Sequence, residues 1–113
     1  MVLLVDDDED IRQSIGDLLL AKGYPVITAA DGAEALSILA NATRPCVVLL
    51  DLVMPGMDGW KFLAAIRNDP SLSTLPVVIV SAHAATHAPT GCAGLLRKPF
   101  ELDDLLHIVA QHC

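Results

Sequence analysis

Acidic side chains gather at two points of the chain, each directly after a short apolar run. Five consecutive acids, Asp6 to Asp10, follow Val2–Val5, and Asp51 follows Cys46–Leu50. If the two runs are neighbouring parallel strands, these carboxylates converge, and their repulsion raises the cost of ionisation unless a cation intervenes. A small cation that prefers oxygen ligands, such as Mg²⁺, is the natural partner. The alternative is a solvated helix start, in which acids suit the helix dipole.

Two further apolar segments are followed by a hydroxyl group and an ammonium group. Ser81 directly follows the run Val77–Val80. Lys98 follows the next short apolar segment, Gly94–Leu96, after one intervening residue. An aspartate that forms an acyl phosphate needs a metal to shield the incoming charge and fixed donors for the phosphoryl oxygens. Asp51 is therefore the candidate nucleophile, with Asp7, Ser81 and Lys98 in the supporting roles. The alternative for Asp51 is an acid on the side of a helix. For Ser81 it is a cap at the end of a strand, and for Lys98 it is a lysine on the surface.

The elements that must position these side chains alternate along the chain. Continuous apolar runs rich in β-branched residues predict strands buried on both faces, which is typical of a parallel sheet. Apolar residues at helical spacing predict helices between them, and Asp31 followed by Glu34 resembles a capping pair. The predicted strands are Val2–Val5, Val26–Ala29, Cys46–Leu50, Val77–Val80 and Gly94–Leu96. Four helices are predicted. The first carries the apolar stripe Ile11, Ile15, Leu18 and Leu19, and the last carries the apolar stripe Leu102, Leu105, Leu106 and Val109. Between them, one helix runs from Asp31 to about Ala40 and another from about Asp58 to Asn68.

Alternating strands and helices, joined by right-handed crossovers, predict an α/β fold with a doubly wound parallel sheet and helices on both faces. The chain has 113 residues, of which 53% are hydrophobic, so one domain over residues 1–113 can bury its own core. In such sheets, ligands bind beyond the carboxyl ends of the strands, where the strand order reverses. The polar residues named above follow strands at that edge.

The composition of the chain argues against several classes of function. The formal net charge of −7 argues against direct nucleic acid binding, which requires clustered Lys and Arg. No apolar stretch has the length needed to cross a bilayer, so we expect a soluble, cytoplasmic protein that does not act at a membrane. The three cysteines, Cys46, Cys92 and Cys113, show no metal-ligand spacing. We interpret them as unpaired small side chains in a reducing compartment.

Four segments together resemble a known family, the receiver domain of two-component response regulators in the CheY-like superfamily. They are VLLVDDDEDIR, VVLLDLVMPGMDGW, VVIVSAH and GLLRKPF, and the resemblance covers essentially the whole chain. It implies a flavodoxin-like sheet of five parallel strands in the order 2-1-3-4-5. It also implies that Asp51 is the phosphorylation site, that Asp7 binds Mg²⁺ directly and that Asp6 does so mainly through water.

The same resemblance implies the remaining roles. The backbone carbonyl of Val53 would be a further metal ligand beside Asp51, Ser81 would hydrogen-bond a phosphoryl oxygen, and Lys98 would pair with Asp51 or its phosphate. Mg²⁺ is the implied cofactor, with Mn²⁺ as a substitute. The phosphoryl donor would be a phosphohistidine on a sensor histidine kinase or on a histidine phosphotransfer protein.

Two features depart from the pattern of this family. The stretch from Ser81 to Lys98 is several residues shorter than usual and contains Pro89 and Gly91, so we expect the fourth helix to be shortened or absent. Leu95 stands where the family has Tyr or Phe as a conformational toggle. The output surface and the downstream target are therefore not predicted by the resemblance.

The implied function is a phosphorylation-dependent signalling module that catalyses only its own phosphorylation and dephosphorylation and is not a metabolic enzyme. An alternative is a degenerate receiver that recognises a protein partner without phosphorylation. A phosphatase with an aspartyl nucleophile is a weaker alternative, because such enzymes need a second acid two residues after the nucleophile, where this chain has Val53.

Trp60 lies just inside a predicted helix near Asp51. For a single tryptophan, packing in the core is more common than contact with a ligand, so we expect Trp60 to pack in the core.

Overall fold

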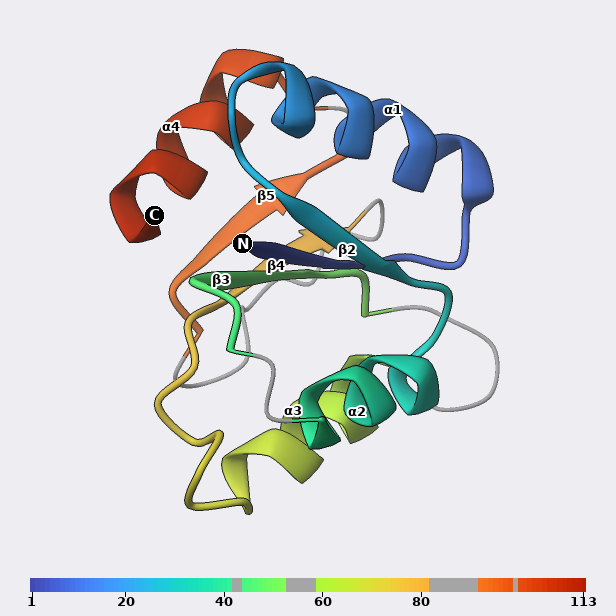
Figure 1. The fold of residues 1–113 in the computed structure, drawn as a ribbon, viewed down its shortest axis with the longest axis vertical. Coiled ribbons are helices and arrows are strands. Elements are labelled where there is room, and N and C mark those ends of the chain that lie inside the picture. Colours follow the sequence, from blue (N-terminus) through green and yellow to red (C-terminus); the bar gives the residue numbers. More distant parts are fainter. Residues whose placement is uncertain (42–43, 53–58, 82–91, 99) are drawn as a thin grey trace.

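The computed structural model describes residues 1–41, 44–52, 59–81, 92–98 and 100–113, in which five strands form one parallel sheet (Figure 1). The strands are β1 (Val2–Val5), β2 (Val26–Ala29), β3 (Val47–Leu50), β4 (Val77–Ser81) and β5 (Gly94–Arg97). Their spatial order is β2-β1-β3-β4-β5, so the strand order reverses between β1 and β3. The predicted fold class, a doubly wound parallel sheet in the flavodoxin-like order, is confirmed.

Four helices in the described part of the chain cover the two faces of this sheet. They are α1 (Glu9–Ala21), α2 (Gly32–Ala40), α3 (Gly59–Arg67) and α4 (Leu102–His112). α1 and α4 lie on one face, and α2 and α3 lie on the other (Figure 1). None of these four helices has the length and apolar character needed to span a membrane.

β1 and β3, two of the three interior strands, are buried on both faces. Successive side chains of a strand point to opposite faces, so Leu3 and Val5 of β1 pack in the core on the side of α2 and α3. Val2 and Leu4 pack in the second core, on the side of α1 and α4. β3 is buried throughout in the same way. This double burial explains why the strands read as continuous apolar runs and not as an alternating pattern.

Aspartates cap the first two helices. The Asp8 side chain accepts hydrogen bonds from the backbone N–H groups of Asp10 and Ile11 at 2.9 and 3.3 Å, which starts α1. The Asp31 side chain accepts the Glu34 N–H at 2.8 Å, so the predicted start of α2 is confirmed. Each cap satisfies backbone donors that have no partner inside the helix.

Several predicted boundaries shift by one to three residues. β3 begins at Val47, one residue after Cys46, while β4 includes Ser81 and β5 extends to Arg97 because these two residues pair in the sheet. α4 continues beyond the predicted stripe to His112. Residues 82–91, where the fourth helix of the family is expected to be shortened or absent, lie outside the described residues, as does residue 58.

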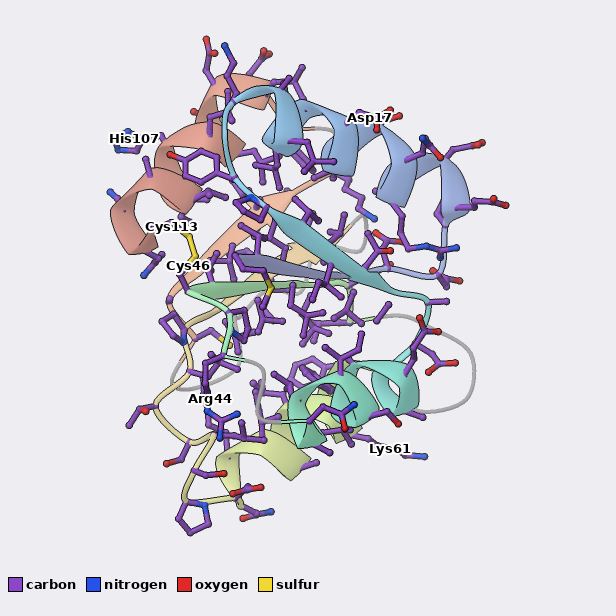
Figure 2. All side chains as sticks on the ribbon, viewed as in Figure 1. Asp17, Arg44, Cys46, Lys61, His107 and Cys113 are labelled. Atoms are coloured by element: carbon purple, nitrogen blue, oxygen red, sulfur yellow. A yellow bond between two sulfur atoms is a disulfide. The ribbon has the colours of Figure 1, made fainter. Side chains whose placement is uncertain are left out.

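The structure contradicts the expectation that all three cysteines are unpaired. Cys46 and Cys113 form a disulfide with their Cα atoms 5.4 Å apart, and Cys92 is the free cysteine. Spacing alone could not reveal this pair, because its members are separated by 67 positions in the sequence. They meet only because the fold places the end of α4 beside the start of β3 (Figure 2).

Candidate functional site

The sheet brings the first acidic cluster and Asp51 to the same edge. β1 and β3 are neighbours, and Val5 is in register with Leu50, so the residues that follow them leave the sheet at the same level. The Asp51 N–H donates to the Val5 carbonyl at 2.9 Å, which extends the pairing of the two strands by one residue. The carboxyl ends of β1 and β3 therefore fix where Asp6 and Asp51 lie.

Three carboxylates converge at this edge. Oxygen atoms of Asp6, Asp7 and Asp51 all lie within 4.8 Å of one another. Asp6 and Asp51 are buried, with 2% and 8% of their surface exposed, whereas Asp7 is exposed to solvent. A cluster of carboxylate oxygens, partly open to water, fits Mg²⁺, which prefers oxygen ligands and usually retains several waters.

Lys98 brings a positive charge to the same carboxylates. Its Nζ lies 2.6 Å from Asp6 Oδ2 and 3.7 Å from Asp51 Oδ2, and its side chain is 15% exposed. Sequence reasoning placed Lys98 beside Asp51, but the nearer partner in the structure is Asp6. Since partial burial weakens solvent screening, water screens the attraction in both contacts less than in an ion pair on an open surface.

Asp6 is held through both of its carboxylate oxygens. Oδ2 accepts from Lys98, and Oδ1 accepts the backbone N–H of Asp8 at 2.9 Å. The Asp6 backbone carbonyl accepts a further hydrogen bond from Arg12 Nη1 at 2.7 Å. Sequence reasoning missed Arg12, whose only signal is its place near the start of a helix that begins within the acidic run, at Glu9. α1 thus orients the loop that carries the carboxylates.

Gly59 is a second residue that sequence reasoning missed. Its N–H donates to the Leu52 carbonyl at 3.0 Å as α3 begins. A Cβ at this position would lie 2.5 Å from both the Asp51 carbonyl oxygen and Leu52 Cα. Only glycine allows the start of α3 to approach the backbone of Asp51 this closely.

Ser81 in part and Val53 as a whole lie outside the described residues. Ser81 ends β4 and pairs with Arg97 of β5, so its backbone is at the same edge of the sheet, but its side chain lies outside the described residues. Val53 also lies outside them, so its proposed carbonyl ligand stays a prediction. Trp60 is 48% exposed at the start of α3, so the expectation that it packs in the core is wrong.

Comparison with known sequences identifies one family. The sequence model described as "Response regulator receiver domain" matches residues 2–110. The protein PilG of Pseudomonas aeruginosa is 34% identical over 98% of this chain and 85% of its own length. The response regulator Rre1 of Synechocystis is 38% identical over 96% of this chain but only 49% of its own length. For the DNA-binding transcriptional regulator NtrC of Escherichia coli, also 38% identical, the chain spans 24% of the relative.

Solved structures agree with this result. The chemotaxis response regulator CheY4 of Vibrio cholerae is 34% identical and superposes with a TM-score of 0.86, covering 99% of this chain and 97% of that one. The response regulator TrrA of Thermotoga maritima, crystallised with Mg²⁺ and BeF, is 26% identical with the same TM-score and the same coverage.

Proposed function

This chain belongs to the response regulator receiver domain family, and on that premise we propose that it is a phosphoryl-accepting signalling switch in which Asp51 is transiently phosphorylated. The observation that supports this most strongly is the buried Asp51 carboxylate, which lies beside Asp6 and Asp7 and within reach of Lys98. The phosphoryl donor would be a phosphohistidine on a sensor histidine kinase or on a histidine phosphotransfer protein. The output would be a change in the binding of a partner protein.

The chemistry is a single phosphoryl transfer. A carboxylate oxygen of Asp51 attacks the phosphorus, the bond between phosphorus and the histidine nitrogen breaks, and that nitrogen keeps the electron pair. Bound Mg²⁺ supplies positive charge that lowers the repulsion between the carboxylate and the phosphoryl group. Lys98 already lies 3.7 Å from Asp51 Oδ2, so its ammonium group can pair with the charge that arrives on the phosphoryl oxygens. We assign the Ser81 hydroxyl as a further donor to these oxygens.

Asp6, Asp7 and Asp51 would hold the Mg²⁺, together with the Val53 carbonyl. Both carboxylate oxygens of Asp6 already accept hydrogen bonds within the protein, whereas Asp7 is open to solvent. This difference favours Asp7 as a direct ligand and Asp6 as a ligand that acts mainly through water. Mn²⁺ prefers the same oxygen ligands and would substitute.

The proposed activity is confined to the protein's own aspartate. It would catalyse its own phosphorylation and dephosphorylation, without a metabolic substrate, in the cytoplasm, where such kinases present their phosphohistidine. We propose no direct nucleic acid binding, since the net charge is −7. The DNA binding in the name of NtrC does not bear on this, because the chain spans only 24% of that protein.

Incubation with acetyl phosphate and Mg²⁺, followed by intact-mass measurement, tests the proposal. Wild type should gain the mass of one phosphoryl group, and the gain should disappear in Asp51→Asn and when a chelator removes Mg²⁺. Asp17→Asn is the matched control, since Asp17 is an exposed acid on α1 away from the cluster (Figure 2). A folded wild type that gains no phosphoryl group would favour the degenerate receiver, which binds its partner without phosphorylation.

A further inference from the structure

The Cys46–Cys113 disulfide lies at the edge of the sheet opposite to the carboxylate cluster. Cys46 directly precedes β3, and Asp51 directly follows it, so the strand separates the two sites. Cys113 directly follows α4, and Figure 2 shows the bond between the two sulfur atoms at the end of this helix. The bond joins the residue that follows α4 to the residue that precedes β3, and neither cysteine is one of the proposed phosphorylation residues.

We propose that Cys46 and Cys113 form a reversible thiol–disulfide site that reacts with small thiols and disulfides of the glutathione class. In the closed state the disulfide holds the last turn of α4 against the start of β3. In the open state the two thiols are free and this turn is released. The redox state of this pair thus controls whether the last turn of α4 is held, at the end of the sheet remote from Asp51.

The exposure of the two cysteines differs in a way that suits exchange. Cys113 is exposed, whereas Cys46 is partly buried against the core that α1 and α4 share. Exchange requires a thiolate to reach one sulfur of the bond, and exposed disulfides are the labile ones. An incoming thiolate therefore reaches the sulfur of Cys113 first.

The exchange reaction balances with a small disulfide as the oxidant. On opening, a thiolate forms a mixed disulfide with Cys113, and Cys46 leaves as a thiolate that takes a proton from water. A second thiolate then attacks the mixed disulfide, which releases the small disulfide and the Cys113 thiolate. Closing is the reverse, so the two protein thiols are oxidised as one small disulfide is reduced to two thiols.

α4 has anchors that do not depend on the disulfide. Leu105 and Val109 are fully buried in the core beneath the helix, and the Ile108 side chain lies so close to Gly94 of β5 that a Cβ there would be 2.6 Å from Ile108 Cδ1. Beyond Val109 the turn has a hydrogen bond from the Cys113 N–H to the Val109 carbonyl at 2.9 Å. Opening the disulfide should therefore loosen this turn and leave the rest of the helix in place.

Cys92 is unsuited to form a disulfide with Cys46 or with Cys113. It packs against the other core, on the side of α2 and α3, so the sheet lies between it and the core that Cys46 contacts. Burial raises the pKa of the Cys92 thiol, which lowers the fraction of reactive thiolate at neutral pH. Cys92→Ser is therefore the matched control, since it removes a cysteine but keeps the pair.

Equilibration in glutathione buffers, acid quenching and alkylation of the unfolded chain test the reaction. At high oxidised glutathione, wild type should have one alkylatable thiol, at Cys92, and at high reduced glutathione it should have three. Cys92→Ser should open and close at the same glutathione ratio, and so should Asp51→Asn, which keeps this test independent of phosphorylation. Three thiols at every ratio, a bond that includes Cys92, or a bond that reduced glutathione never opens would each overturn the proposal.

Hydrogen exchange of the two forms tests the structural consequence. Amides of residues 109–113 should exchange on the order of tenfold faster in the reduced form, while β1 and β3 keep their protection. Cys113→Ser should match the reduced wild type in both redox buffers. Equal exchange of this turn in the two forms would show that the disulfide does not hold α4, and would overturn the proposal even if the bond opens reversibly.

Discussion

Asp6 is the most constrained carboxylate of the candidate site. It is almost fully buried, and its two oxygens accept from the Lys98 ammonium group and from the Asp8 N–H. A buried charge persists only when it is paired and hydrogen-bonded. Lys98, which contacts both carboxylates, therefore helps Asp6 and Asp51 to lie together.

Substituting Lys98 with methionine should expose this dependence. The buried carboxylates lose their cation, so without divalent ions the free energy of unfolding should fall by about 1–3 kcal/mol. Added Mg²⁺ should restore part of the loss, because it binds the folded state and replaces the missing charge. Urea unfolding with and without MgCl₂ measures both effects, and Lys22→Met, at the exposed end of α1, is the control. A loss that Mg²⁺ does not reduce would mean that Lys98 acts through packing.

Asp7 should matter for the metal more than for the fold. Asp7→Ala should weaken Mg²⁺ binding by roughly tenfold or more, since a direct oxygen ligand is lost. Stability without Mg²⁺ should not fall, because one of the converging charges is removed. Calorimetry or Trp60 fluorescence reports the affinity. Asp8→Asn is the control, since it keeps an oxygen acceptor for the helix cap, and it should bind Mg²⁺ far better than Asp7→Ala does. Equal Mg²⁺ affinities of wild type and Asp7→Ala would show that Asp7 is not a ligand.

The start of α3 closely confines the backbone of Asp51. Gly59 touches the backbone of Asp51 and Leu52, so any side chain here must displace backbone atoms. Another glycine inside a helix, Gly16 of α1, has nothing within 4 Å of the position that a Cβ would take. The two glycines therefore provide a matched pair of substitutions.

Gly59→Ala and Gly16→Ala should change stability in opposite directions. Gly59→Ala should destabilise the fold by about 1–3 kcal/mol through overpacking, and should slow phosphorylation because the Asp51 backbone shifts. Gly16→Ala should stabilise it by about 0.5–1 kcal/mol, since alanine is the better helix former and meets no obstacle. Denaturant unfolding and the rate of reaction with acetyl phosphate check both variants. A Gly59→Ala protein as stable and as reactive as wild type would show that α3 does not constrain Asp51.

Across the whole molecule, the disulfide closes a loop of 67 positions that contains Asp51 and Lys98. The chain-entropy model gives a loop of this size about 4 kcal/mol of stabilisation, and disulfides typically deliver about 2–4 kcal/mol. Reduction should then lower Tm by roughly 10 °C for a domain of this size. Thermal unfolding with and without a phosphine reductant measures the shift. Cys92→Ser should show the same shift and Cys46→Ser none, whereas a wild type with equal Tm in both conditions would contradict the stabilising role.

The parts of this molecule that were predictable are those set by the backbone. β1 and β3 were recognisable because both of their faces are buried, and parallel pairing then placed Asp6 and Asp51 at one edge. The partner of Lys98 was not predictable, because the choice between 2.6 Å to Asp6 and 3.7 Å to Asp51 depends on side-chain conformation. The role of Gly59 and the pairing of Cys46 with Cys113 depend on contacts between segments distant in sequence, which periodicity and spacing do not encode.

The assignment of Asp51 is best examined by identifying the phosphorylated residue itself. Wild type is treated with acetyl phosphate and Mg²⁺, the acyl phosphate is reduced with borohydride, and the peptides are sequenced by mass spectrometry. Hydride reduction converts a phosphorylated aspartate to homoserine, so the residue that carried the phosphoryl group is marked permanently. We predict homoserine at position 51 alone, and none when Mg²⁺ is withheld. Homoserine at Asp6, Asp7 or another acid instead, or an unmodified Asp51 in folded protein, would contradict the proposed function.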